Sequence, residues 1–266
     1  MLRTDMEEVD NVVQDTVLRF ICNFVRPDLC IMLSKQPNSL NIVSAQLQHL
    51  EFEIRLCKPS LDGRVDPTVT HAQWDRMLSQ VRIMRNRGPE VMQARMLNRY
   101  GRVNENVSSL HPYRDDDKTQ PVEYRMKRKL GTLDMAATGP FDLRFAASLE
   151  LPLDDAQKPS DAQVTERFLK SRWSFVFFST IRCDFTRLDP VYRDAGTFKV
   201  NRDTPIYQVE LEIVDLKNAI DMGMDPKAIW KHVRELVSIL VAAADGQRHN
   251  IKYSILKQRM YTRVMP

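Results

Sequence analysis

Charged side chains occupy every second position in several segments that otherwise have the composition of β-strands. In HLEFEIRLCK, residues 49–58, charged residues alternate with leucine, phenylalanine and isoleucine. Successive side chains of a strand point to opposite faces, so Glu51, Glu53 and Arg55 share one face and the apolar residues share the other. A strand of an antiparallel sheet often has one solvated face. A solvated sheet is therefore the first interpretation, and the other strands test it.

Other segments repeat this alternation, and the sign of the charge differs between them. Residues 207–214 place Glu210 and Glu212 on one face, so this strand is acidic like residues 49–58. Two further strands have purely basic faces, and two have mixed faces. The basic faces carry Arg125, Lys127 and Lys129, and Lys170 and Arg172, whereas the mixed faces carry Arg144, Ser148 and Glu150, and Arg182, Asp184 and Thr186.

Paired glutamates argue against a solvated face. Glutamates two positions apart on a strand lie about 7 Å from each other and repel. A hard divalent cation such as Mg²⁺ or Mn²⁺ binds carboxylate oxygens and removes this repulsion. Lysine and arginine side chains instead suit a polyphosphate. We therefore infer that the charged faces line the inside of a closed barrel, where acidic strands hold a metal and basic strands hold an anion.

Helical segments can cover the outer, apolar faces of these strands. Residues 7–25, 70–88 and 225–246 have helical apolar spacing, with Thr70 and Asp225 as helix caps. The expected fold is α+β: a closed antiparallel β-barrel of about eight strands with helices packed outside. We expect one domain over residues 1–266, with an N-terminal helical extension to about residue 45, the barrel and its helices to about residue 247, and a basic tail over 248–266.

Composition excludes several classes of protein. Charged residues make up 28% of the chain, and the longest apolar run is too short to cross a bilayer, so we expect no membrane association. The four cysteines have no CxxC spacing, which favours reduced thiols inside a cell over disulfides or zinc. The net charge of +4 agrees with an anionic partner. The basic tail contains tyrosines and could either contact RNA or a partner, or cap the domain.

In their order, these motifs resemble the fungal- and protist-type RNA 5′-triphosphatases of mRNA capping, members of the triphosphate tunnel metalloenzymes. The resemblance spans residues 49–214. It begins with a Glu-x-Glu strand followed by a basic residue and ends with a glutamate-rich strand. Between them lie a basic strand, an Asp-x-Arg…Ser-x-Glu strand, an alternating basic run before Ser-Phe, and an Asp-x-Thr. The matching residues are Glu51, Glu53, Arg55, Lys127, Lys129, Asp142, Arg144, Ser148, Glu150, Lys170, Arg172, Ser174, Phe175, Asp184, Thr186, Glu210 and Glu212.

Three positions depart from the family pattern. Gln208 stands where the closing strand has its first glutamate, and Cys57 where a glycine often follows the first motif. Phe168 stands where a third basic residue often precedes Lys170 and Arg172. None of the three is a residue that we assign to the metal.

The resemblance implies a reaction and a role for each site residue. The reaction is metal-dependent hydrolysis of the γ-phosphate from the 5′-triphosphate end of nascent mRNA, which leaves a diphosphate for cap formation, with nucleoside triphosphates as side substrates. Glu51, Glu53 and Glu212 would bind Mg²⁺ or Mn²⁺. Glu210 would position water or support the ligands, and Glu150 would orient or deprotonate the attacking water. The phosphate contacts would be Arg55, Lys127, Lys129, Arg144, Lys170, Arg172 and Arg182, with Arg102 a further candidate; Arg182 and Asp184 could alternatively form a pair that braces the wall.

Two alternatives remain open from the sequence. An inorganic tripolyphosphatase or thiamine-triphosphatase of the same superfamily usually has a Glu-x-Glu-x-Lys strand near its N-terminus, whereas fifty residues precede Glu51 here. A non-catalytic RNA- or anion-binding barrel would have no use for paired glutamates. By resemblance, the expected partners are 5′-triphosphate RNA, nucleoside triphosphates and an mRNA guanylyltransferase, and the expected location is the nucleus. The oligomeric state stays open.

Overall fold

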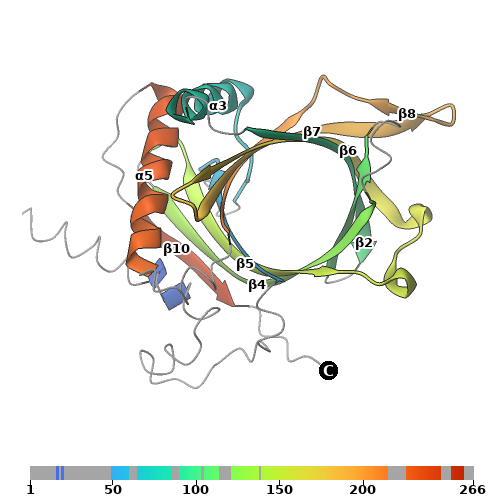
Figure 1. Cartoon of the computed structure of the whole chain (residues 1–266), viewed down its shortest axis with the longest axis horizontal. Helices are drawn as coiled ribbons and strands as arrows, with labels where there is room; N and C mark the ends of the chain where they lie inside the picture. The colour runs from blue at the N-terminus through green and yellow to red at the C-terminus, as the bar shows by residue number, and fades with distance from the viewer. Residues whose placement is uncertain are drawn as a thin grey trace, which may run out of the picture.

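The computed structural model describes residues 16–17, 19–20, 49–59, 65–85, 90–102, 105–113, 121–137, 139–214, 226–246 and 253–260. These residues form two long helices, two short 3₁₀ turns and ten strands (Figure 1). The helices are α3 (His71–Arg85) and α5 (Pro226–Asp245). The strands are β1 (Leu50–Cys57), β2 (Val91–Arg102), β3 (Glu105–Pro112), β4 (Glu123–Ala137), β5 (Asp142–Pro152), β6 (Val164–Phe177), β7 (Ile181–Asp194), β8 (Thr197–Val200), β9 (Ile206–Ile213) and β10 (Tyr253–Met260).

Eight of the strands close into a barrel. Hydrogen bonds join them in the order β4-β3-β2-β6-β7-β9-β1-β5, and β5 pairs back with β4. Every pairing is antiparallel. β8 extends β7 as a hairpin, and β10 adds to β4 outside the closed ring (Figure 1). This architecture confirms the predicted closed antiparallel barrel with helices packed outside.

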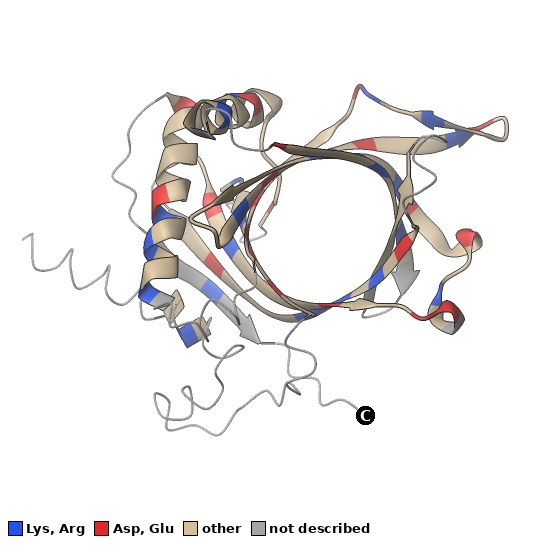
Figure 2. Ribbon diagram, viewed as in Figure 1, with Lys and Arg blue, Asp and Glu red and all other residues tan. Residues whose placement is uncertain are grey.

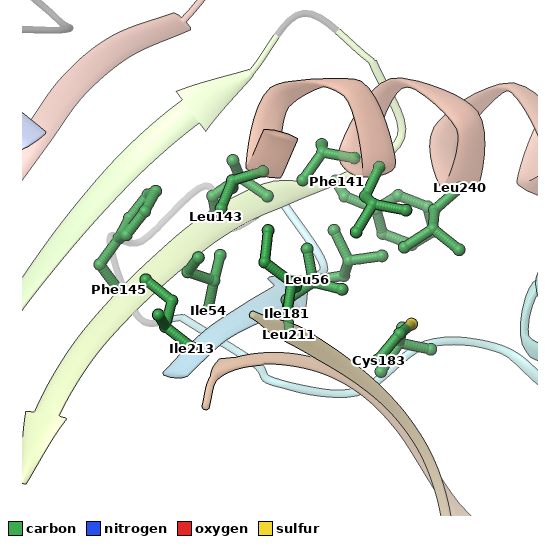
Figure 3. Packing of buried hydrophobic residues seen from close by; sticks show 14 of the residues in the cluster. Ile54, Leu56, Phe141, Leu143, Phe145, Ile181, Cys183, Leu211, Ile213 and Leu240 are labelled. Carbon is green, nitrogen blue, oxygen red and sulfur yellow. The ribbon is translucent and has the colours of Figure 1, made fainter. Parts of the chain in front are cut away.

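The outer face of the barrel is apolar where α5 packs on it. Ile54, Leu143 and Leu211 are fully buried there and belong to the same core cluster as Trp230 and Leu240 of α5. Figure 3 shows Ile54, Leu143 and Leu211 on the strands and Leu240 on the helix that covers them. Because adjacent residues of a strand point to opposite faces, burial of these apolar residues outside the barrel turns their charged neighbours inward.

Helix α3 covers a second part of the outer face. Its N-terminus is capped as predicted, since the Thr70 hydroxyl accepts a hydrogen bond from the Gln73 backbone N–H at 3.3 Å, and the Gln73 side chain accepts from the Thr70 backbone N–H at 3.0 Å. Trp74 then packs edge-on against Trp173 of β6 and Phe185 of β7, with ring centroids 5.3 and 6.0 Å apart. The end that we predicted for this helix, Gly88, lies outside the described residues.

Some segments form structure that the sequence did not predict. Residues 91–112 form the β2–β3 pair, whereas the sequence indicated only one weak strand over residues 98–107, and part of the predicted tail forms β10. Of the predicted N-terminal helical extension, the described residues 16–17 and 19–20 are helical, and Val17 and Phe20 are buried in the main core. The rest of this extension lies outside the described residues. None of the helices among the described residues is long and apolar enough to cross a membrane.

Candidate active site

Acidic and basic side chains alternate in one continuous chain of ion pairs inside the barrel. The chain joins residues from β1, β4, β6, β7 and β9, and Figure 2 shows charged residues of both signs along the strands that surround the interior. Because every acid in the chain faces a base, the charges largely compensate one another in the metal-free protein. The order of the pairs is Glu51–Lys127–Glu53–Arg55–Glu210–Arg172–Asp184–Arg182–Glu212.

The distances in this chain show direct contacts. Glu53 lies 3.0 Å from both the Lys127 ammonium and the Arg55 guanidinium. Arg55 in turn lies 2.8 Å from Glu210, and Arg172 lies 3.5 Å from the same carboxylate. These residues thus form one electrostatic unit, in which moving one side chain changes the partners of the next.

Strand register brings the two predicted glutamate pairs together. On β1 and β9, Glu53 stands opposite Glu212, and Arg55 stands opposite Glu210. Directly opposed residues of antiparallel strands share a face, with Cβ atoms about 4.5–5.5 Å apart. β1 and β9 are distant in sequence, but their glutamates therefore form one acidic cluster, with Glu51 two residues along β1 from Glu53.

The basic strand β4 lies on the other side of this cluster. Lys127 stands opposite Glu150 of β5, and Lys129 stands opposite Ser148. The Lys127 ammonium contacts Glu51 and Glu53 and lies 3.9 Å from Glu150. Glu150 also accepts a hydrogen bond from Arg125 at 2.9 Å. Glu150, our candidate to deprotonate the attacking water, therefore lies beside two cations, and one of them, Lys127, also contacts the acidic cluster.

A β-bulge in β4 adds an interior acid that the sequence analysis missed. The register shifts between Lys129 and Gly131, so alternate odd residues face inward before the bulge and alternate even residues after it. Asp134 consequently stands opposite Arg144, and the two form a bidentate pair at 2.6 and 2.9 Å. The glycine within the strand was the available signal, since an interior glycine often marks a bulge.

Two predicted phosphate ligands form no ion pair with any residue that the structure describes. Lys129 is exposed, and neither it nor Lys170 has an ion pair among the described residues. Burial, together with the nearby Arg172 guanidinium, lowers the pKa of Lys170 to about 8, although nearby carboxylates oppose the shift. A buried ammonium without a carboxylate partner is suited to receive an anion.

The three glutamates of β9 and β1 with shifted pKa values differ in state. Burial, with Glu51 and Asp184 nearby, raises the pKa of Glu212 to about 7, although Arg182 opposes the shift. Burial also raises the pKa of Glu53 despite Arg55 and Lys127. Burial raises the pKa of Glu210 too, but Arg55 and Arg172 outweigh it and bring the value to about 2. Glu210 therefore stays ionised, whereas burial disfavours the ionised forms of Glu53 and Glu212 despite their basic partners.

These carboxylates form a donor set that suits a hard divalent cation. Within the described ranges, no three acidic, histidine or cysteine side chains are already arranged around one point as a metal site. Glu51 and Glu53 are turned towards Lys127, and Glu212 towards Arg182. A divalent cation would favour the ionised forms of Glu53 and Glu212, whose pKa is raised mainly by burial and further by neighbouring carboxylates. The residue types fit Mg²⁺ or Mn²⁺, provided that the carboxylates leave their present partners.

Phe168, one of the departures from the family pattern, belongs to an apolar patch on the inner face. It stands opposite Leu97, which stands opposite Leu110 on its other side, and Leu188 stands opposite Ile206. These five residues form a separate small cluster, which we call the apolar wall. The Arg99 guanidinium lies 5.0 Å from the centre of the Phe168 ring. Among the other candidates, Gln208 stands opposite Thr186, and the side chain of Arg102 lies outside the described residues.

Comparison with known proteins identifies the group to which this arrangement is similar. Residues 12–252 match the family model described as mRNA capping enzyme, beta chain. The structure is similar to the S. pombe Pct1 RNA triphosphatase, with a TM-score of 0.62, 15% identity, and coverage of 90% of this chain and 94% of that one. Pct1 in complex with the Spt5 CTD gives a TM-score of 0.60, with 15% identity and coverage of 90% and 93%. None of the curated proteins matches the sequence.

Proposed function

The chain belongs to the family of the mRNA capping enzyme β chain, the RNA triphosphatases of capping, and from this we propose that it hydrolyses the γ-phosphate of triphosphate-ended RNA with Mg²⁺ or Mn²⁺. The products would be 5′-diphosphate RNA and inorganic phosphate, and nucleoside triphosphates would be side substrates. The observation that carries the proposal is the acidic cluster of β1 and β9 inside a barrel whose other strands supply cations. A barrel that only bound anions would gain nothing from buried, mutually repelling glutamates.

We assign the metal to Glu51, Glu53 and Glu212. When bound, the metal would polarise the γ-phosphoryl group and neutralise the charge that gathers on its oxygens. Glu210, which remains ionised and contacts both Arg55 and Arg172, would hold these two guanidinium groups in place. Its role is therefore to position phosphate-binding cations and to support the metal ligands.

Glu150 is our candidate to accept the proton of the attacking water. The water oxygen would form a bond to the γ-phosphorus as the bond from that phosphorus to the bridging oxygen breaks, and the bonding electron pair would remain on the β-phosphate. The carboxylate would take the proton that the water loses. Phosphate oxygens would be bound by the basic residues of the interior: Arg55, Lys127, Lys129, Arg144, Lys170, Arg172 and Arg182.

The contacts of Asp184 support a bracing role. Its side chain is almost fully buried and lies 2.9 Å from Arg172 and 3.1 Å from Arg182. An ionised aspartate at this position would repel a phosphate. We therefore propose that Asp184 orients the two arginines, which reach the anion themselves.

The cellular setting follows from the family. One similar structure is the S. pombe RNA triphosphatase in complex with the Spt5 CTD. We propose that this chain acts in the nucleus on nascent transcripts, with an mRNA guanylyltransferase as the enzyme that receives its product.

Substrate comparison tests the reaction and its closest alternatives. The purified protein is assayed for phosphate release from triphosphate-ended RNA, inorganic tripolyphosphate and thiamine triphosphate, each with Mg²⁺, with Mn²⁺ and with chelator. We expect metal-dependent release of one phosphate from RNA with the highest kcat/KM. A higher kcat/KM for tripolyphosphate or thiamine triphosphate would assign the chain to the alternative activity, and binding without release would favour the non-catalytic barrel.

A further inference from the structure

The apolar wall differs from the rest of the barrel interior, where charged side chains suited to charged ligands predominate. Leu97, Phe168 and Leu188 are buried, and Leu110 and Ile206 pack against them. Their register places them on the same faces as the charged interior residues, since Leu188 stands opposite Lys170 and Arg95 is the neighbouring inward residue before Leu97. Phosphate oxygens gain nothing from apolar surface and lose their hydration against it. The wall itself is nearly closed to solvent, so a ligand would approach it through the exposed Arg99 side chain that covers Phe168.

Arg99 and Phe168 form a stacked pair at the end of the barrel where β2 ends and β6 begins. The guanidinium covers the ring at 5.0 Å and forms an ion pair with Glu166 at 3.0 Å. The Arg99 side chain is 43% exposed, whereas the Phe168 ring beneath it is buried. A planar guanidinium that is backed by an aromatic ring and open to solvent is a surface on which a nucleobase can stack.

The order of inward residues along β6 matches the order of groups in triphosphate-ended RNA. Phe168, Lys170 and Arg172 alternate with outward residues. The Cα atoms of successive inward residues therefore lie about 7 Å apart along the strand. Phe168 lies nearest the barrel end, Lys170 has no ion pair among the described residues, and Arg172 contacts Glu210 and Asp184 within the ion-pair chain. In triphosphate-ended RNA, an aromatic base is followed by anionic phosphates. This order complements an aromatic ring followed by the cations Lys170 and Arg172.

We propose that the Arg99–Phe168 stack binds the base of the first nucleotide, with the triphosphate running inward past Lys170 towards Arg172. This inference rests on the proposed function and adds the orientation of the substrate and a source of its selectivity. The stack favours triphosphates that carry a nucleoside over inorganic tripolyphosphate. Phe168 occupies a position where the family often has a basic residue, so the selectivity is a property of this chain's own sequence.

The test compares one substrate that has a base with one that does not. The KM and kcat for triphosphate-ended RNA and for inorganic tripolyphosphate are measured in the wild type, Phe168→Leu and Arg99→Ala. Loss of one base–aromatic stack corresponds to about a 5- to 100-fold weakening. We expect KM for RNA to rise in this range in both variants, with KM and kcat for tripolyphosphate within about twofold of wild type.

A control variant next to Phe168 separates a role in base binding from a general effect of removing a buried side chain. Leu169→Ala removes an equally buried neighbour that points outward, and it should leave the ratio of the two KM values unchanged. Arg99 is well exposed, so its variant remains informative if Phe168→Leu folds poorly. If both substrates weaken equally, or neither does, the stack has no role in binding the base. A wild type that cleaves tripolyphosphate but not RNA would instead overturn the proposed function.

Discussion

Lys170 differs from most cations of the barrel interior because it has no carboxylate partner among the described residues. Burial and Arg172 lower its pKa to about 8. Below that pH the ammonium is charged and can bind a phosphate, and above it the charge is lost. The residue therefore links anion affinity to pH in this range.

This difference gives a pH prediction. Affinity of the metal-free protein for inorganic tripolyphosphate, measured by calorimetry, should fall as pH rises from 7 to about 9.5, because Lys170 loses its proton across this interval. Lys170→Arg keeps the charge throughout and should lose this part of the pH dependence, and it also controls for titration of the ligand. Parallel pH profiles in the two proteins would show that Lys170 does not bind the anion.

Glu150 and Glu53 should be distinguishable by their response to metal. Glu150→Gln cannot accept a proton, so kcat should fall by roughly 10²- to 10⁴-fold while metal affinity stays near that of the wild type. Glu53→Gln should weaken metal binding, and excess Mn²⁺ should partly restore its turnover. Titration of Mn²⁺ into both variants measures both effects. Rescue of Glu150→Gln but not of Glu53→Gln would reverse the two assignments.

At the scale of the element, the bulge in β4 decides which of its residues reach the interior. Without the shift between Lys129 and Gly131, Asp134 would point outward. The inward Arg144 would then lack this carboxylate as a partner. The Asp134 carboxylate is buried, and the Arg144 guanidinium is only partly exposed. The pair therefore contributes to the stability of the β4–β5 side of the barrel as well as to the charge of the interior.

Asp134→Asn should destabilise the protein by roughly 1–3 kcal/mol, because it leaves a guanidinium with a weaker acceptor in a largely enclosed position. Asp155→Asn is the control, since that carboxylate is 95% exposed and its replacement should leave the stability unchanged. Urea denaturation measures both variants. Equal stability of the two would mean that the interior pair contributes nothing net.

Local patterns were sufficient for strands that alternate cleanly. Around Glu53 of β1, Arg172 of β6, Asp184 of β7 and Glu210 of β9, polar and apolar residues alternate over several positions, so the inward face could be predicted there. The closed barrel followed because so many inward faces were charged. β10 was not predicted because it pairs with the distant strand β4, and the β2–β3 hairpin was indicated only weakly because charged and apolar residues do not alternate cleanly along it. The inward direction of Asp134 could not be predicted because the bulge changes the alternation. The apolar wall could not be predicted without the register that places Leu97 opposite Phe168.

At the scale of the whole molecule, the ion-pair chain keeps a highly charged interior nearly neutral. Metal ligation by Glu51, Glu53 and Glu212 would release Lys127 and Arg182, which now contact them, for contact with phosphate. Metal and anion should thus bind with positive coupling, and each should raise the affinity for the other by the same factor. Isothermal titration of tripolyphosphate with and without Mn²⁺ measures this factor, and a factor of one would contradict partner exchange.

The same charges should make the stability of the metal-free fold depend on pH. The pKa of Glu212 is about 7 in the folded protein against 4.5 as its ordinary value, so the folded state binds more protons between these pH values. The free energy of unfolding should therefore fall as pH rises from about 4.5 to 7, through this residue. Glu212→Gln should remove that contribution and stabilise the metal-free protein at pH 8 by on the order of 1–3 kcal/mol. Thermal denaturation in chelator tests this, and a less stable variant at pH 8 would show that the pair with Arg182 outweighs the desolvation of Glu212.

The most direct test of the proposed mechanism is to measure phosphate release from triphosphate-ended RNA by variants of the three proposed metal ligands. Glu51→Ala, Glu53→Ala and Glu212→Ala are compared with wild type and with Glu235→Ala, which changes an exposed glutamate of α5. With Mn²⁺ or Mg²⁺ we expect wild type and Glu235→Ala to release one γ-phosphate per RNA end. Each interior variant should keep its fold and lose activity, because a hard cation deprived of one of three carboxylates loses affinity and geometry. Near-normal release by any interior variant would remove that residue from the metal site, and metal-independent release by the wild type would contradict the proposed mechanism as a whole.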